Sequence, residues 1–246
     1  MKRASALICV AALLGALHAA PLPAQICAGF PSLRDTRFGA TLNAASYTYA
    51  TALGVSVTAG RDWYATLGVG RTRDAEMDAS TYPISLEGGG DVEWGSRRFF
   101  FCPIAALAVS LGPYNYALEQ RDFRFVDAAA GLGAAAVAVQ TPRLSLILTA
   151  GVRVVHATAR GWYSGDSPYN AGSWTGTNDY GLATAGVGIT LDRILTIRPT
   201  VTVLFGQRSQ QPIDWIALPF GRDRGEISFG IAIGIAAGRL RPGGPD

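Results

Sequence analysis

The stretch EISFGIAIGIA, residues 226–236, alternates between two kinds of side chain at every step. One set is large and apolar, and consists of Ile227, Phe229, Ile231, Ile233 and Ile235. The other is small or polar: Glu226, Ser228, Gly230, Ala232, Gly234 and Ala236. A period of two indicates a β-strand whose faces meet different surroundings. Residues 196–205 and 63–70 repeat the pattern.

The composition of the second set distinguishes a membrane barrel from a water-soluble sandwich. A soluble sheet also alternates, but its solvent face is polar. Here that set is rich in Gly, Ala, Ser and Thr, and only 16% of the chain is charged while 49% is hydrophobic. Small residues suit a crowded barrel lumen. The pattern therefore predicts an all-β fold, a closed antiparallel up-and-down transmembrane β-barrel of about ten strands.

The alternation repeats in segments of about ten residues separated by turn residues. No stretch after residue 24 has the roughly 18 uninterrupted apolar residues of a membrane-spanning helix. Connections of two kinds, short and mostly longer, alternate along the chain, as periplasmic turns and extracellular loops do in outer-membrane barrels. The predicted strands are 36–45, 49–59, 63–71, 81–93, 98–111, 123–139, 144–159, 179–191, 196–205 and 226–237.

The first 24 residues have the layout of a secretory signal peptide. Lys2 and Arg3 form a positive start, Leu7 to Leu17 is apolar, and Leu22-Pro23-Ala24 offers a cleavage site. An N-terminal membrane anchor is the alternative, although the apolar run is short for a span. We expect a signal peptide at 1–24, a periplasmic segment at 25–35, the barrel at 36–238 and a polar tail at 239–246.

Charge excludes a nucleic-acid partner. The net charge of +3 falls to about +1 without Lys2 and Arg3, because 19 basic and 18 acidic groups remain. No basic cluster with interleaved aromatic residues occurs, so the footprint of a nucleic-acid-binding protein is absent from the sequence.

Several motifs carry a resemblance. They are Cys-Ala-Gly-Phe-Pro at Cys27–Pro31, Phe101-Cys102-Pro103, Ile197-Arg198-Pro199 and the Gly-alternating strand Ser228–Gly238. With the signal, they make the chain similar to small bacterial outer-membrane β-barrel proteins, the porin-like barrel domains. The resemblance implies the bacterial outer membrane as location, with its lipid bilayer and the barrel assembly machinery as partners. It carries over no catalytic residue, and the polar tail lacks the terminal aromatic of many such barrels.

Two cysteines remain once the signal peptide, which contains Cys9, is cleaved. Cys27 and Cys102 suit one disulfide in an oxidising compartment, with two free thiols as the alternative. Leu107, Val109 and Leu111 place the odd positions of their strand toward lipid, so Cys102 should face the lumen. A bridge to Cys27 would hold the N-terminal segment as a partial plug.

No catalytic, cofactor or metal site is expected. His156 is the single histidine after the signal, and two distant cysteines do not have ordinary zinc spacing. His156 and Thr158, two apart, are similar to the His and Ser of lipid A deacylases. A hydrolase also needs an orienting carboxylate, for which Asp166 or Asp179 would have to serve. We predict a protein that is not an enzyme.

The predicted strand phases turn five charged residues toward the lumen: Glu87, Asp91, Arg153, Arg198 and Glu226. Because an unpaired buried charge is costly, paired charges would close the lumen and unpaired charges would line a path. The first interpretation is a largely closed barrel with a structural or surface-contact role, in which loops 160–178 and 206–224 meet small solutes or surface ligands. The alternatives are a narrow passive channel for small solutes and, more distantly, a lipid-modifying hydrolase.

Overall fold

The computed structural model describes residues 27, 37–47, 50–60, 63–74, 79–112, 120–163, 172–192, 194–210 and 227–237. Within them, no helix is long and apolar enough to cross a membrane. Almost all of these residues belong to strands. The strands are β1 (Arg37–Ser46), β2 (Ala50–Gly60), β3 (Trp63–Asp74), β4 (Ala79–Gly90), β5 (Val92–Trp94), β6 (Ser96–Leu111), β7 (Gln120–Gln140), β8 (Leu144–Tyr163), β9 (Gly172–Leu191), β10 (Leu195–Gln210) and β11 (Ile227–Ala237).

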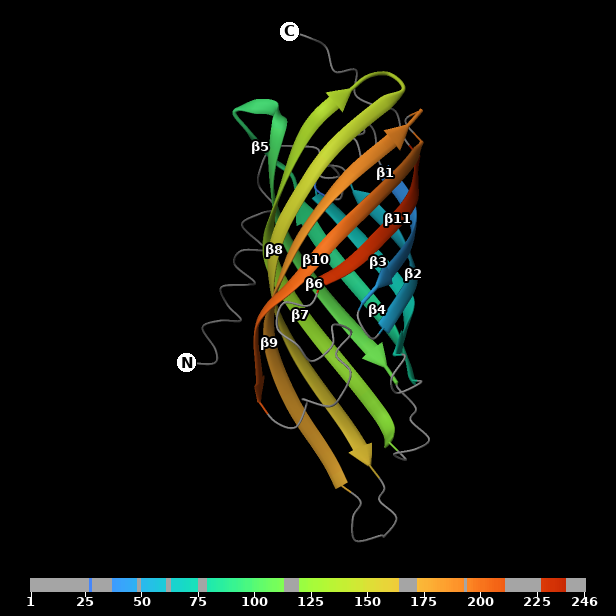
Figure 1. Cartoon of the computed structure of the whole chain (residues 1–246), viewed down its shortest axis with the longest axis vertical. Coiled ribbons are helices and arrows are strands. Elements are labelled where there is room, and N and C mark those ends of the chain that lie inside the picture. The colour runs from blue at the N-terminus through green and yellow to red at the C-terminus, as the bar shows by residue number, and fades with distance from the viewer. Residues whose placement is uncertain are drawn as a thin grey trace.

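Ten of these strands form a closed antiparallel ring, as the alternation predicted (Figure 1). Each pairs with its neighbour in sequence, and β1 pairs with β11 to close the ring. β4 pairs directly with β6. Among the described strands, the three-residue β5 pairs with β6 alone. The chain leaves the ring at Asp91, so β5 forms a flap beside β6 and is not an eleventh strand of the ring.

The stagger of the ring can be followed through paired inward-facing residues. One path from Ser56 reaches Ser145 on β8 through Thr41, Gly234, Thr196 and Thr190. The opposite path from Ser56 reaches Ala157 on β8 through Gly68, Ser85, Ala108 and Asp127. The two end points differ by 12 residues (157 − 145). A stagger of this size over ten strands implies a tilt of about 40° and a narrow interior.

The two faces of each strand divide as the sequence predicted. The outer face carries large apolar side chains, including Leu132 (66% exposed), Val154 (63%) and Ile231 (46%). On β8 the outward apolar residues run from Leu144 to Val154. Ten residues on a strand tilted by about 40° rise about 25 Å, the height of the apolar band of an outer-membrane barrel.

Strand boundaries agree with prediction within about three residues at the short turns and differ more at several of the opposite ends. β9 begins at Gly172 rather than at residue 179, and β10 ends at Gln210 rather than at 205. β8 continues to Tyr163, so the predicted loop 160–178 is wrong over most of its length, and loop 206–224 loses its first five residues. β8 and β9 project beyond the rest of the ring in Figure 1.

Candidate functional site: the barrel lumen

A disulfide joins Cys27 to Cys102 across 75 residues of sequence, as predicted, with their Cα atoms 6.0 Å apart. This separation lies in the usual range for disulfides. Cys102 is on β6, is fully buried and faces the interior. Since Phe101 and Leu107 of the same strand are exposed on the outer face, the predicted phase of this strand is correct.

An apolar cluster surrounds the bridge near the short-turn end of the lumen. Its buried members are Phe100, Cys102, Ala135 and Ile147, which come from β6, β7 and β8. Cys27, Ile104 and Val137 pack against them. The Cys27 N–H donates a hydrogen bond of 3.2 Å to an Asp91 carboxylate oxygen. Residue 27 is therefore held inside the ring by a covalent bond, a hydrogen bond and apolar contacts.

A charged network lies next to this cluster, toward the middle of the barrel. Arg153 Nη1 donates to Glu87 Oε2 at 2.6 Å, and the Tyr64 hydroxyl donates to Glu87 Oε1 at 3.1 Å. Arg198 is close enough to Glu87 and Tyr64 to interact electrostatically with both. Both oxygens of Glu87 are thus used, as a charge drawn out of water requires.

Four inward charges in this half of the lumen compensate one another. Glu87 and Asp91 supply two negative charges, and Arg153 and Arg198 supply two positive charges. Asp91 is 2% exposed, and Glu87 and Arg153 are about a quarter to a third exposed. Glu226, the fifth residue of this predicted set, lies outside the described residues.

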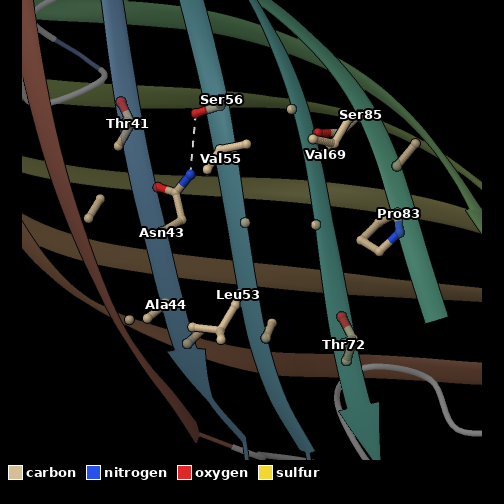
Figure 2. Close-up of a pocket in the computed structure, with 18 of the residues that line it drawn as sticks. Thr41, Asn43, Ala44, Leu53, Val55, Ser56, Val69, Thr72, Pro83 and Ser85 are labelled. Carbon is tan, nitrogen blue, oxygen red and sulfur yellow. Dashed lines mark hydrogen bonds between the residues drawn. The ribbon is translucent and has the colours of Figure 1, made fainter. Parts of the chain in front are cut away.

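A cavity of about 530 Å³ occupies the other half of the lumen, against the wall formed by β1 to β4 (Figure 2). Glu87 and Arg198 of the charged network are part of its lining. Most of its polar lining is hydroxyl. The Ser and Thr residues are Thr41, Ser56, Thr58, Thr66, Thr72, Thr81, Ser85, Ser110, Thr200, Thr202 and Ser228.

Short hydrogen bonds between neighbouring strands fix part of this lining. Asn43 Nδ2 donates to Ser56 Oγ at 3.2 Å, shown as the dashed line in Figure 2. The hydroxyls of Thr58 and Thr66 lie 2.8 Å apart. Asp127 also lines the cavity, and one of its carboxylate oxygens is buried without a hydrogen-bond partner among the described residues. Among the described residues, the cavity therefore offers polar groups to a small ligand and one carboxylate, Asp127, with an oxygen that no protein group engages.

The cavity and the network include residues that the sequence did not single out. Tyr64 is the clearest case, since it is a large aromatic residue in a small or polar set. Gly89, its partner on β4, makes room for the ring: an added Cβ would lie 2.7 Å from Tyr64 Cε1. An aromatic residue opposite a glycine run is a signal that could have placed both in the interior.

Cys27, Asp91 and Cys102 bring three potential metal-binding atoms within 4.8 Å of one another. Metal-binding cysteine requires a thiolate, and both sulfurs here belong to the disulfide. The cluster in this oxidised form therefore does not supply a zinc-type site.

His156 and Asp179 meet on the outer face, away from the lumen. His156 Nδ1 lies 2.7 Å from Asp179 Oδ1, and both side chains are more than half exposed. They occupy directly opposed positions on β8 and β9. Thr158 shares the outward phase of His156, whereas Asp166 lies outside the described residues. The pair forms just beyond Val154, the last apolar outward residue of β8.

Several solved structures match the chain. The translocator domain of the autotransporter NalP from Neisseria meningitidis matches with a TM-score of 0.51 and 16% identity, covering 82% of this chain and 89% of that one. The NanC porin matches at 0.37 and 10% identity, covering 81% of this chain and 100% of that one. The N-terminal β-barrel domain of OprF from Pseudomonas aeruginosa matches at 0.28 and 11%, covering 80% and 95%.

No protein-family model and no curated protein sequence matches the chain. At these identities the structural likeness concerns the fold alone. The chain has the fold of an outer-membrane β-barrel, and its exposed apolar band is consistent with the predicted location in the bacterial outer membrane.

Proposed function

We propose that this protein is a largely closed outer-membrane barrel with a structural or surface-contact role. One observation carries the proposal: the short-turn half of the lumen contains a tethered segment at Cys27 and inward charges that compensate one another. A path for ions needs water-filled space along its whole length and charges free to interact with the solute. Here Glu87 has both oxygens engaged by protein side chains.

The second candidate is a narrow passive channel, and the hydroxyl-lined cavity favours it. A volume of about 530 Å³ is in the range of small-molecule sites. In the closed-barrel proposal this cavity is closed at one end, at Glu87 and Arg198. In the channel proposal it is the wide part of a path that passes the disulfide.

Single-channel conductance in planar bilayers separates these candidates. We expect the wild-type protein to show no steady conductance steps in 1 M KCl, and the C27S/C102S variant to show them once the segment is released. Glu93→Gln, on the flap, is the matched control for Glu87→Gln in the network, and only the latter should add conductance. Steady steps from the oxidised wild-type protein would overturn the closed barrel in favour of the channel.

We also propose that the barrel is not an enzyme. The His156–Asp179 pair is the arrangement a general base requires, but a hydrolase also needs an activated nucleophile within hydrogen-bond reach. No hydrogen bond joins Thr158 to His156 among the described residues. Incubation of the folded protein with phospholipid and lipid A vesicles should release no fatty acid; release that disappears in His156→Ala would refute this.

A further inference from the structure

The outer face changes character abruptly at the long-loop end of three strands, β3 and the neighbours β7 and β8. On β8 the apolar series ends at Val154 and continues as His156, Thr158 and Arg160. On β7 the outward series ends at Val126, and the next outward residue is Arg124. On β3 it ends at Val69 and continues as Arg71 and Arg73. The arginines therefore follow the apolar band, at the level where lipid headgroups lie.

Arg124 and Arg160 are directly opposed on β7 and β8. Both are exposed on the outer face, and neither has an ion pair or hydrogen bond with any described residue. Like charges directly opposed across two strands destabilise the pairing. An anion between the two guanidinium groups would remove this repulsion.

The nearest outward carboxylate in this part of β8 and β9 is already engaged. Asp179 bonds His156, which lies four residues before Arg160 on the same strand. A guanidinium group presents paired donors that match phosphate, and two such groups side by side can hold one phosphate from two directions. Arg71, by contrast, already donates to the Ser80 hydroxyl.

We propose that Arg124 and Arg160 bind the phosphate group of a lipid in the surrounding leaflet. The position of the pair favours a lipid over a soluble phosphate compound, because the outward face directly beneath it is apolar and contacts acyl chains. A lipid phosphate would be held at this height by its own chains, while a soluble anion would have to be captured from water by two exposed side chains. This site is separate from the lumen and does not depend on whether the barrel conducts.

Native mass spectrometry of the full chain in detergent, titrated with diphosphorylated lipid A, tests the proposal. Each arginine near an anionic lipid surface contributes about a five-fold change in affinity, so R124Q/R160Q should bind about thirty-fold more weakly. The matched control is R98Q/R143Q, which removes two exposed arginines at the short-turn end and leaves the same net charge. It should bind as the wild type does.

Two further arms identify the source of the phosphate. Lipid A from which the phosphates have been removed should bind the wild-type protein as weakly as it binds R124Q/R160Q. Inorganic phosphate at the same concentration should not displace the lipid. Equal binding by wild type and double variant, equal losses in both double variants, or displacement by inorganic phosphate would each overturn the proposal. If R124Q/R160Q does not fold, the single variants carry the test, with about a five-fold loss expected in each.

Discussion

The two halves of the lumen are built by the same ten strands and are filled in opposite ways. Near the short turns, inward positions hold Phe100, Ile147 and the disulfide, followed by the Glu87 network. Against β1 to β4 in the other half, inward positions hold small and hydroxyl residues around a cavity. The period-two alternation runs through both halves, so the inward side chains and the tethered residue 27 together decide where the barrel is closed.

This difference shows how a barrel of fixed diameter can be filled near one end and enclose a cavity in its other half. Ring size is set by strand number and stagger, which do not change along the axis. A segment from outside the ring, residue 27, fills the space where inward side chains and the tether meet. Against β1 to β4, where no described residue from outside the ring lies, hydroxyls such as Thr58 and Thr66 bond to one another across strands beside the cavity.

Removal of the tether should have the largest effect on the plugged half. The free energy of unfolding of the C27S/C102S variant should be about 4 kcal/mol lower than that of the wild type, because the bridge closes a loop of 75 residues. Urea titration of protein in detergent micelles, followed by tryptophan fluorescence, measures the change. The oxidised and reduced wild type provide an internal control, since reduction should shift only the bridged protein. A difference below about 1 kcal/mol would mean that the plug holds without the bridge.

A charge on the lipid face should lower the free energy of unfolding slightly less than removal of the bridge does. Its effect locates the edge of the hydrocarbon layer. Ile231 lies on β11 in the apolar band and is 46% exposed on the outer face. Ile231→Arg should cost about 2–4 kcal/mol, the range for arginine near the bilayer midplane. Thr175→Arg, on the exposed extension of β9, is the control and should cost less than about 1 kcal/mol. The same titration in lipid bilayers measures both; equal costs would place Ile231 outside the hydrocarbon.

Matched alanine substitutions compare the two halves of the lumen directly. Ala135 belongs to the packed cluster and is 4% exposed, whereas Ala52 lines the cavity. Ala135→Leu should cost about 1–3 kcal/mol because overpacking forces neighbours to move. Ala52→Leu should cost less than about 1 kcal/mol, since its added methyl groups enter existing space. If both variants lose the same stability, the cavity is not a space that side chains can fill.

Loss of the exterior pair should have the smallest effect. His156 and Asp179 are more than half exposed, and exposed ion pairs contribute roughly 0–1 kcal/mol. His156→Ala should therefore change the free energy of unfolding by less than about 0.5 kcal/mol, measured by the same urea titration. A loss above about 1 kcal/mol would show that the pair is held more tightly than its exposure implies.

Alternation predicted the ring and its short-turn boundaries because the apolar set ends where the bilayer ends. The same reason explains the missed extensions. Past the band, β9 presents Thr175, Thr177 and Asp179 on its outer face, so hydrogen-bonded strand continues without any apolar set to mark it. Prediction of the disulfide needed only two cysteines and one strand phase.

The polar partners inside the barrel were harder to predict. Strand phase turns Glu87 and Arg153 inward, but their contact depends on the stagger, which brings residues 66 positions apart to one level. No local sequence pattern encodes this separation between the two residues. The sequence likewise offers no sign of which inward hydroxyls leave space between them, because cavity volume depends on the whole ring.

The bridge between Cys27 and Cys102 also constrains the order in which this molecule can be assembled. Both sulfurs belong to the first 102 residues, whereas ring closure needs β11, whose last described residue is Ala237. A tether formed early would travel with β1 to β6 and be enclosed when the last strand arrives. A tether formed late would require residue 27 to enter a finished ring through its mouth. The timing of oxidation relative to ring closure therefore decides which of these two routes the chain must take.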